Sequence, residues 1–162
     1  MGRFASLVDT PEGIEAFETQ YNIPPRVIIQ HYLLVDWQGL RLERAMVIPM
    51  IAFIEGGMQI PMGRVSRDFL IAHRLCPTQY SPNLFRIPGS VNALNLKMRV
   101  NLTHHNVNWV YNCQYLKDIG YYLKTRVPSI RLISCFPESN KGLDQDFLIV
   151  AGEWHDVLHC ST

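Results

Sequence analysis

The chain has 162 residues, of which 48% are hydrophobic and 18% are charged, and its formal net charge is +1. This size and composition are ordinary for one globular domain that buries a sizeable core. The longest apolar run, residues 45–54, contains Pro49 and is too short for a membrane-spanning helix, which needs roughly 20 apolar residues. We therefore expect no transmembrane segment.

The charges are unevenly distributed. Residues 61–141 hold eleven Lys/Arg against three acids, whereas residues 1–60 and 142–162 carry local net charges of −3 and −4. A basic middle segment can bind nucleic acid or an acidic partner. Ion pairs between this segment and the acidic ends of the same chain explain the charge distribution equally well. The first 20 residues show no secretory pattern, so the expected location is intracellular, in the nucleus or the cytoplasm. The four widely spaced cysteines are then expected to be reduced thiols.

Local signals predict the first elements of the chain. Asp9-Thr10-Pro11-Glu12 predicts the start of a short helix, with a capping side chain, a proline in the first turn and an acid beside it. Residues 25–34 are rich in β-branched side chains without a clear period, which leaves helix and strand open. Residues 40–55 are apolar on most faces and end at Gly56-Gly57, which predicts a buried helix bent at Pro49.

Three further helices are expected in the middle of the chain. Residues 64–75 predict an amphipathic helix that gathers three basic side chains on one face, those of Arg64, Arg67 and Arg74. Ser81-Pro82 predicts the start of another helix, which Pro88-Gly89 should break or kink. Thr103 is expected to cap a helix that ends at Gly120.

Beyond Gly120, residues 121–123, 130–136 and 147–150 are short aromatic and β-branched runs, typical of three strands in a small antiparallel sheet. The predicted fold class is therefore α+β, mostly helical in the N-terminal two-thirds and followed by a small antiparallel sheet. We expect residues 1–20 to form an N-terminal extension or short helix, residues 21–156 one domain, and residues 157–162 a tail of a truncated frame. The predicted core comprises Phe53, Phe69, Leu70, Phe85, Leu94, Trp109, Leu132 and Phe147.

Three phrases of the sequence suggest a family. They are residues 53–61 (FIEGGMQIP), residues 81–86 (SPNLFR), and Ser139-Asn140-Lys141-Gly142 followed by the apolar run 147–150. Together they resemble the gypsy-type transposon (transposase-like) domain of plant retroelement-derived proteins, over roughly residues 20–156. The resemblance implies a non-catalytic structural or interaction domain of a gag-like or transposase-like protein. The resemblance implies that the gene belongs to a mobile element, and it does not specify a chemical reaction for the protein.

A transposase or nuclease would need clustered carboxylates to hold two divalent metal ions. Asp68, Asp118 and Glu153 are the available set, but Asp68 lies on a predicted helix and Glu153 follows a predicted strand, unlike the corresponding catalytic acids. We therefore predict no catalytic residue, no cofactor and no enzymatic activity. The alternative is an enzyme relic of a transposase or nuclease.

A zinc-binding nucleic-acid module is the other alternative, because His and Cys are the ligands that zinc prefers. His73 and Cys76 have ligand spacing, but the second pair, His155 with His159 or Cys160, lies about 80 residues further on and is unlike the first. We predict no metal site from this half-matching pattern.

The residues expected to contact nucleic acid or a protein partner are basic and lie in the middle of the chain: Arg64, Arg67, Arg74, Arg86 and Lys141. Ser139-Asn140-Lys141-Gly142 lacks the frame of a phosphate-binding loop and predicts a tight connection that presents Lys141 to solvent or to a partner. No membrane partner is expected, and the oligomeric state stays open.

Overall fold

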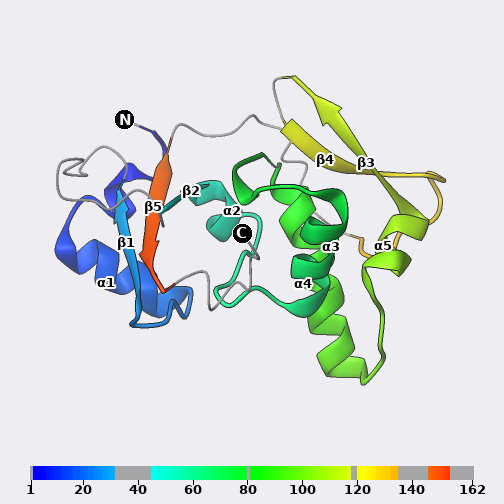
Figure 1. The fold of residues 1–162 in the computed structure, drawn as a ribbon, viewed down its shortest axis with the longest axis horizontal. Coiled ribbons are helices and arrows are strands. Elements are labelled where there is room, and N and C mark those ends of the chain that lie inside the picture. Colours follow the sequence, from blue (N-terminus) through cyan, green and yellow to red (C-terminus); the bar gives the residue numbers. More distant parts are fainter. Residues whose placement is uncertain (1, 32–44, 80, 118–119, 135–145, 154–162) are drawn as a thin grey trace.

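The computed structural model describes residues 2–31, 45–79, 81–117, 120–134 and 146–153. Its described part contains two antiparallel sheets, which lie at opposite ends of the molecule with helices α3 and α4 between them (Figure 1). The first sheet has the order β1-β5-β2 and the second is the hairpin β3-β4. The fold class is α+β, as predicted.

The N-terminal residues pack against the first sheet (Figure 1). Helix α1 (Pro11–Gln20) begins as predicted, because Thr10 Oγ1 accepts the Gly13 N–H at 3.1 Å. Phe17 of this helix lies against Phe53, with ring centroids 5.7 Å apart. Residues 1–20 thus contribute to the same hydrophobic core as the rest of the chain, through Val8 and Phe17.

Strand β1 (Val27–His31) settles the helix-or-strand question for that segment, since it pairs with β5 (Phe147–Gly152). The predicted helix over residues 40–55 is wrong in its first described part: β2 (Met46–Pro49) is a strand on the other side of β5, and only α2 (Met50–Ile54) is helical. Pro49 fits at the end of an edge strand, because it has no N–H to donate. Gly57 follows α2 with a φ of 64°, the left-handed conformation expected there.

The next two helices confirm their predictions, because α3 spans Arg64–His73 and α4 spans Pro82–Met98. Helix α4 does not break at Pro88, however. A proline removes one hydrogen bond from a helix, but the helix also buries a row of apolar side chains that hold it in place. These buried side chains are Leu84, Phe85, Ile87 and Val91.

Two later predictions are wrong. The helix that starts after Thr103, α5 (His104–Val110), ends ten residues before Gly120, and the chain continues as β3 (Tyr111–Leu116), paired with β4 (Gly120–Thr125). Residues 130–134 form no strand, and residues 135 and 136 lie outside the described part. The Leu132 and Ile133 N–H groups instead donate to Tyr111 Oη, at 3.2 and 3.4 Å.

The predicted core is confirmed for its central members, and Trp109 is the error. Four of the predicted side chains are buried, namely those of Phe53, Phe69, Leu70 and Phe85. Three others, those of Leu94, Leu132 and Phe147, are partly buried. Trp109 is 85% exposed, because α5 directs Val107 into the core and a residue two positions later points to the opposite side of a helix. No described helix is long and apolar enough to cross a membrane.

Candidate nucleic-acid interface

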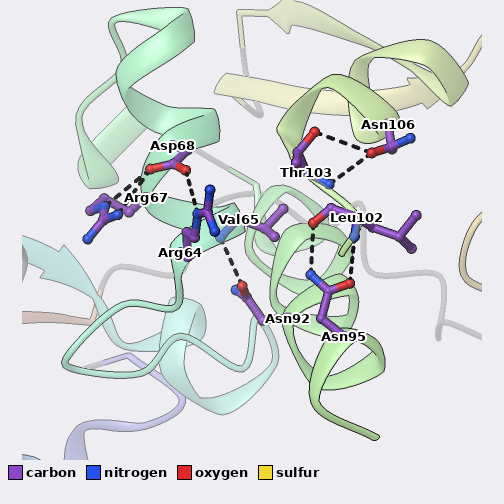
Figure 2. A network of polar contacts seen from close by, with 9 residues as sticks. All are labelled: Arg64, Val65, Arg67, Asp68, Asn92, Asn95, Leu102, Thr103 and Asn106. Carbon is purple, nitrogen blue, oxygen red and sulfur yellow. Dashed lines mark hydrogen bonds and ion pairs between the residues drawn. The ribbon is translucent and has the colours of Figure 1, made fainter. Parts of the chain in front are cut away.

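Two of the predicted contact residues on α3 share one carboxylate. Arg67 Nη2 lies 3.2 Å from Asp68 Oδ1, and Arg64 Nε lies 3.6 Å from Asp68 Oδ2 (Figure 2). Arg74, at the end of α3, is exposed and adopts the left-handed conformation. The face of α3 is therefore less positive than its arginines alone suggest, because Asp68 offsets part of their charge.

Arg86 is not part of an exposed basic stripe, which corrects the sequence prediction. Its side chain is only 10% exposed, and Nη2 lies 3.6 Å from Glu55 Oε2. Its Nε also donates to the Glu55 carbonyl, and Glu55 pairs in addition with Arg3 near the N-terminus. Arg86 thus fastens α4 to the end of α2, a structural role. Lys141 and the motif residues Ser139, Asn140 and Gly142 lie outside the described residues.

The two described carboxylates among those considered for catalysis contact arginines. Asp68 pairs with the arginines of α3, Glu153 lies 3.9 Å from Arg26, and Asp118 is outside the described part. The structure therefore brings none of the three together in the segments that it describes.

The thiol and imidazole groups are also apart. His73 Nε2 is hydrogen-bonded to Asn108 Oδ1 at 2.8 Å, and Cys76 is exposed. In the described ranges no three His, Cys, Asp or Glu residues form a group that could hold a metal ion. The other suggested ligands, His155, His159 and Cys160, are not described. Burial raises the pKa of the Cys113 thiol, which makes it a poorer nucleophile at neutral pH.

A groove of about 530 Å³ lies between residues 57–64, α3 and α4. Its side-chain amides are engaged in holding the two helices together. Asn92 Oδ1 accepts the Val65 N–H at 2.8 Å, and Asn92 Nδ2 donates to Ser66 Oγ at 3.0 Å (Figure 2). These bonds explain the groove as a feature of helix packing.

Exposed apolar side chains are frequent in one stretch of the sequence. Eleven large hydrophobic side chains of the described residues are exposed, and eight of them fall between residues 96 and 130. Trp109 and Tyr115, the most exposed aromatic residues among them, lie on α5 and β3. Surface apolar residues concentrated in one segment are typical of an interaction site.

The same segment carries unpaired positive charge. Between Asp68 and Glu138 the sequence contains eight Lys/Arg and a single acid, Asp118. Four basic side chains on or near the hairpin are exposed and form no ion pair with another described residue: Lys117, Lys124, Arg126 and Arg131. We call these four residues, together with Trp109, Tyr115 and Tyr122, the basic-aromatic surface; its members lie on α5, on both faces of the hairpin and in the segment that follows it.

The hairpin has one polar face and one face that reaches the core. The register pairs Asn112 with Lys124 and Gln114 with Tyr122, so these four side chains share a face. Tyr122 Oη donates to Gln114 Oε1 at 2.9 Å. The opposite face carries the buried Tyr111 and Leu123 and, near the hairpin tip, Tyr115 against Tyr121, with ring centroids 5.1 Å apart.

Several polar contacts fix α5 beside α3 and α4. Asn95 of α4 donates to the Leu102 carbonyl and accepts the Leu102 N–H, both at 2.8 Å (Figure 2). Asn106 Oδ1 then accepts the Thr103 N–H at 2.8 Å, which closes the first turn.

Burial is the main cause that lowers the pKa of His104, and the nearby His105 and His73 lower it further, while Asp68 acts in the opposite direction. His104 is therefore harder to protonate than an ordinary histidine.

Comparison with protein families, with curated proteins and with solved structures found no match for this chain. The argument about function therefore depends on the geometry of the molecule itself. Sequence reasoning placed the basic contacts at Arg64, Arg67, Arg74, Arg86 and Lys141 and did not single out the exposed basic side chains of the hairpin. Two features of the sequence could have pointed to the hairpin. Few acids follow Asp68, and the apolar residues between positions 108 and 116 do not keep a helical period.

Proposed function

We propose that the chain is a non-catalytic interaction domain that binds nucleic acid without sequence preference through the basic-aromatic surface. One observation carries the proposal: Lys117, Lys124, Arg126 and Arg131 are exposed and unpaired among the described residues, and the same stretch of chain exposes Trp109 and Tyr115. Cationic side chains bind phosphates and release their counterions, which requires no particular base sequence.

Nucleic acid fits this surface better than an acidic protein does, because the surface combines charge with aromatic rings and side-chain amides. Tyr122 and Lys124 share the polar hairpin face with Asn112 and Gln114. Aromatic rings can stack on bases, and amides can donate to phosphate or sugar oxygens. An acidic protein partner would need the charges but would make less use of the exposed aromatic rings.

The resemblance to the gypsy-type transposon domain agrees with this role. A gag-like or transposase-like protein of a plant retroelement would be an intracellular protein that handles nucleic acid. We include this origin in the proposal, on the strength of the three sequence phrases given above.

The proposal predicts binding that weakens steeply with salt. Fluorescence anisotropy with a labelled oligo(dT) should show binding at about 50 mM NaCl and much weaker binding at about 200 mM. The triple variant Lys117→Ser/Lys124→Ser/Arg131→Ser should flatten the slope of log affinity against log salt by about 2, since each phosphate contact to a single strand contributes about 0.7.

The matched control is Arg64→Ser/Arg67→Ser/Arg74→Ser, which removes the same charge from α3. It should change the slope less, because Arg64 and Arg67 are already paired with Asp68. Absence of binding at low salt would overturn the proposed function. Equal slopes for the two triple variants would show that binding follows net charge and not the basic-aromatic surface.

A further inference from the structure

Trp109 is exposed on a helix whose backbone is fixed, although burial of an aromatic ring of this size is favourable. Its helix is fixed at the start by Asn95 and Asn106 (Figure 2). The bond between His73 and Asn108 fixes it further along its length. An indole ring on a fixed helix loses little conformational freedom when a ligand stacks on it. The position therefore has the preorganisation of a binding platform.

Arg126 is fixed beside this ring. Its backbone N–H donates to the Val110 carbonyl at 2.8 Å, and its Nε donates to the Asn108 carbonyl at 2.8 Å. These two bonds join the end of β4 to the end of α5. The guanidinium is exposed and has no ion pair with a described residue.

Trp109, Arg126 and Asn108 line a shallow hollow of about 400 Å³. The hollow combines a flat apolar ring with a cation that is held in place. A flat group attached to a phosphate suits this combination, because the ring can stack on the indole while the guanidinium contacts the phosphate.

We infer that the hollow formed by Asn108, Trp109 and Arg126 is a base-stacking site that makes the domain selective for single-stranded nucleic acid. The inference deepens the proposed function and rests on it. A duplex keeps its bases stacked inside, so only a single strand can offer a base to Trp109 while its phosphates reach Arg126.

The test compares oligo(dT) with a duplex of the same length by anisotropy at low salt. Trp109→Ala should weaken binding of the single strand about 5- to 100-fold, as expected for the loss of one base stack, and should leave binding of the duplex within about twofold. Trp109→Phe should retain part of the affinity because it keeps an aromatic face. Trp109→Leu, which is apolar but has no such face, should behave like Trp109→Ala.

Two measurements complete the design. Oligo(dT) should quench the fluorescence of Trp109, obtained as the difference between the wild-type chain and Trp109→Phe because Trp37 and Trp154 are common to both. Ile71→Ala, at an exposed residue of α3, is the control and should change neither affinity. Salt-dependent binding that is unchanged in Trp109→Ala and equal for both strand forms would overturn this inference and leave the proposed function standing. Absence of any binding would overturn both.

Discussion

At the scale of single residues, Asp146 is the most constrained position. Its carboxylate is 1% exposed, and Oδ2 accepts the Phe4 N–H at 2.5 Å. Oδ1 lies 3.9 Å from Nε2 of the buried His31, and neither of these two atoms has a hydrogen-bond partner in the described part of the chain. A buried carboxylate is costly unless it is paired. Asp146 therefore depends on Phe4 and His31, and through them it ties the N-terminal residues to the first sheet.

Replacing Asp146 tests this connection. Asp146→Ala leaves the Phe4 N–H without its acceptor and should lower the free energy of unfolding by about 1–3 kcal/mol. Asp146→Asn keeps an amide oxygen at the same place and should cost less. Urea denaturation followed by circular dichroism gives both values. Losses of equal size, or no loss in Asp146→Ala, would contradict the assignment of Oδ2 as the acceptor that anchors Phe4.

At the scale of elements, the hairpin is held to α4 by one side chain. A two-stranded hairpin alone is marginally stable in water, so β3-β4 needs support from the rest of the fold. Asn83, in the first turn of α4, donates to the Leu123 carbonyl at 3.0 Å and accepts the Leu123 N–H at 3.2 Å. The Ser81 N–H donates to the Tyr121 carbonyl at 2.9 Å. Together these bonds cover the free edge of β4, which would otherwise present unpaired backbone groups.

Asn83→Ala should therefore loosen the hairpin. Because Leu123 is buried, its unpaired N–H and C=O groups should reduce stability by about 1–3 kcal/mol. Hydrogen exchange should accelerate at Leu123 and its neighbours in β4 and stay nearly unchanged in β1 and β5. The control is Asn112→Ala, on the solvent face of the same hairpin. Uniform acceleration over both sheets would mean that Asn83 supports the whole fold and not the hairpin.

At the scale of the whole molecule, hydrophobic side chains are divided between a core and an exposed end. One cluster joins the first sheet, α1 to α5 and the inner face of the hairpin, with Phe53 and Phe69 among its largest fully buried members. The basic-aromatic surface belongs to α5, the hairpin and the segment that follows it, which lie apart from the first sheet (Figure 1). Stability and the proposed binding thus depend on different aromatic residues.

A pair of substitutions separates these two roles. Phe69→Ala removes a fully buried ring and should lower the free energy of unfolding by about 3–5 kcal/mol. Trp109→Ala removes a larger ring from the surface and should change it by no more than about 0.5 kcal/mol. Thermal unfolding monitored by circular dichroism compares the two variants. A large loss in Trp109→Ala would show that the indole is packed in solution, which would contradict its assignment to the surface.

The sequence by itself determined the helix starts and element types that depend on residues close together along the chain. Thr10-Pro11, Ser81-Pro82 and Thr103 mark helix starts, and each helix begins where predicted. The amphipathic period of α3 and the short apolar run of β5 also gave the correct element type. Such signals act within a few residues, so they do not require knowledge of the fold.

The tertiary structure alone decided what depends on distant partners. Residues 46–49 are apolar on all sides and suit a helix or a strand equally, and pairing with β5 makes them β2. Pairing with β4 likewise ends α5 at Val110, which turns Trp109 to the surface. Arg86 looked like its exposed neighbours in the sequence, but Glu55, 31 residues away, holds it in a largely buried pair. In each case the deciding contact is long-range, and local composition carries no information about which distant segment will supply it.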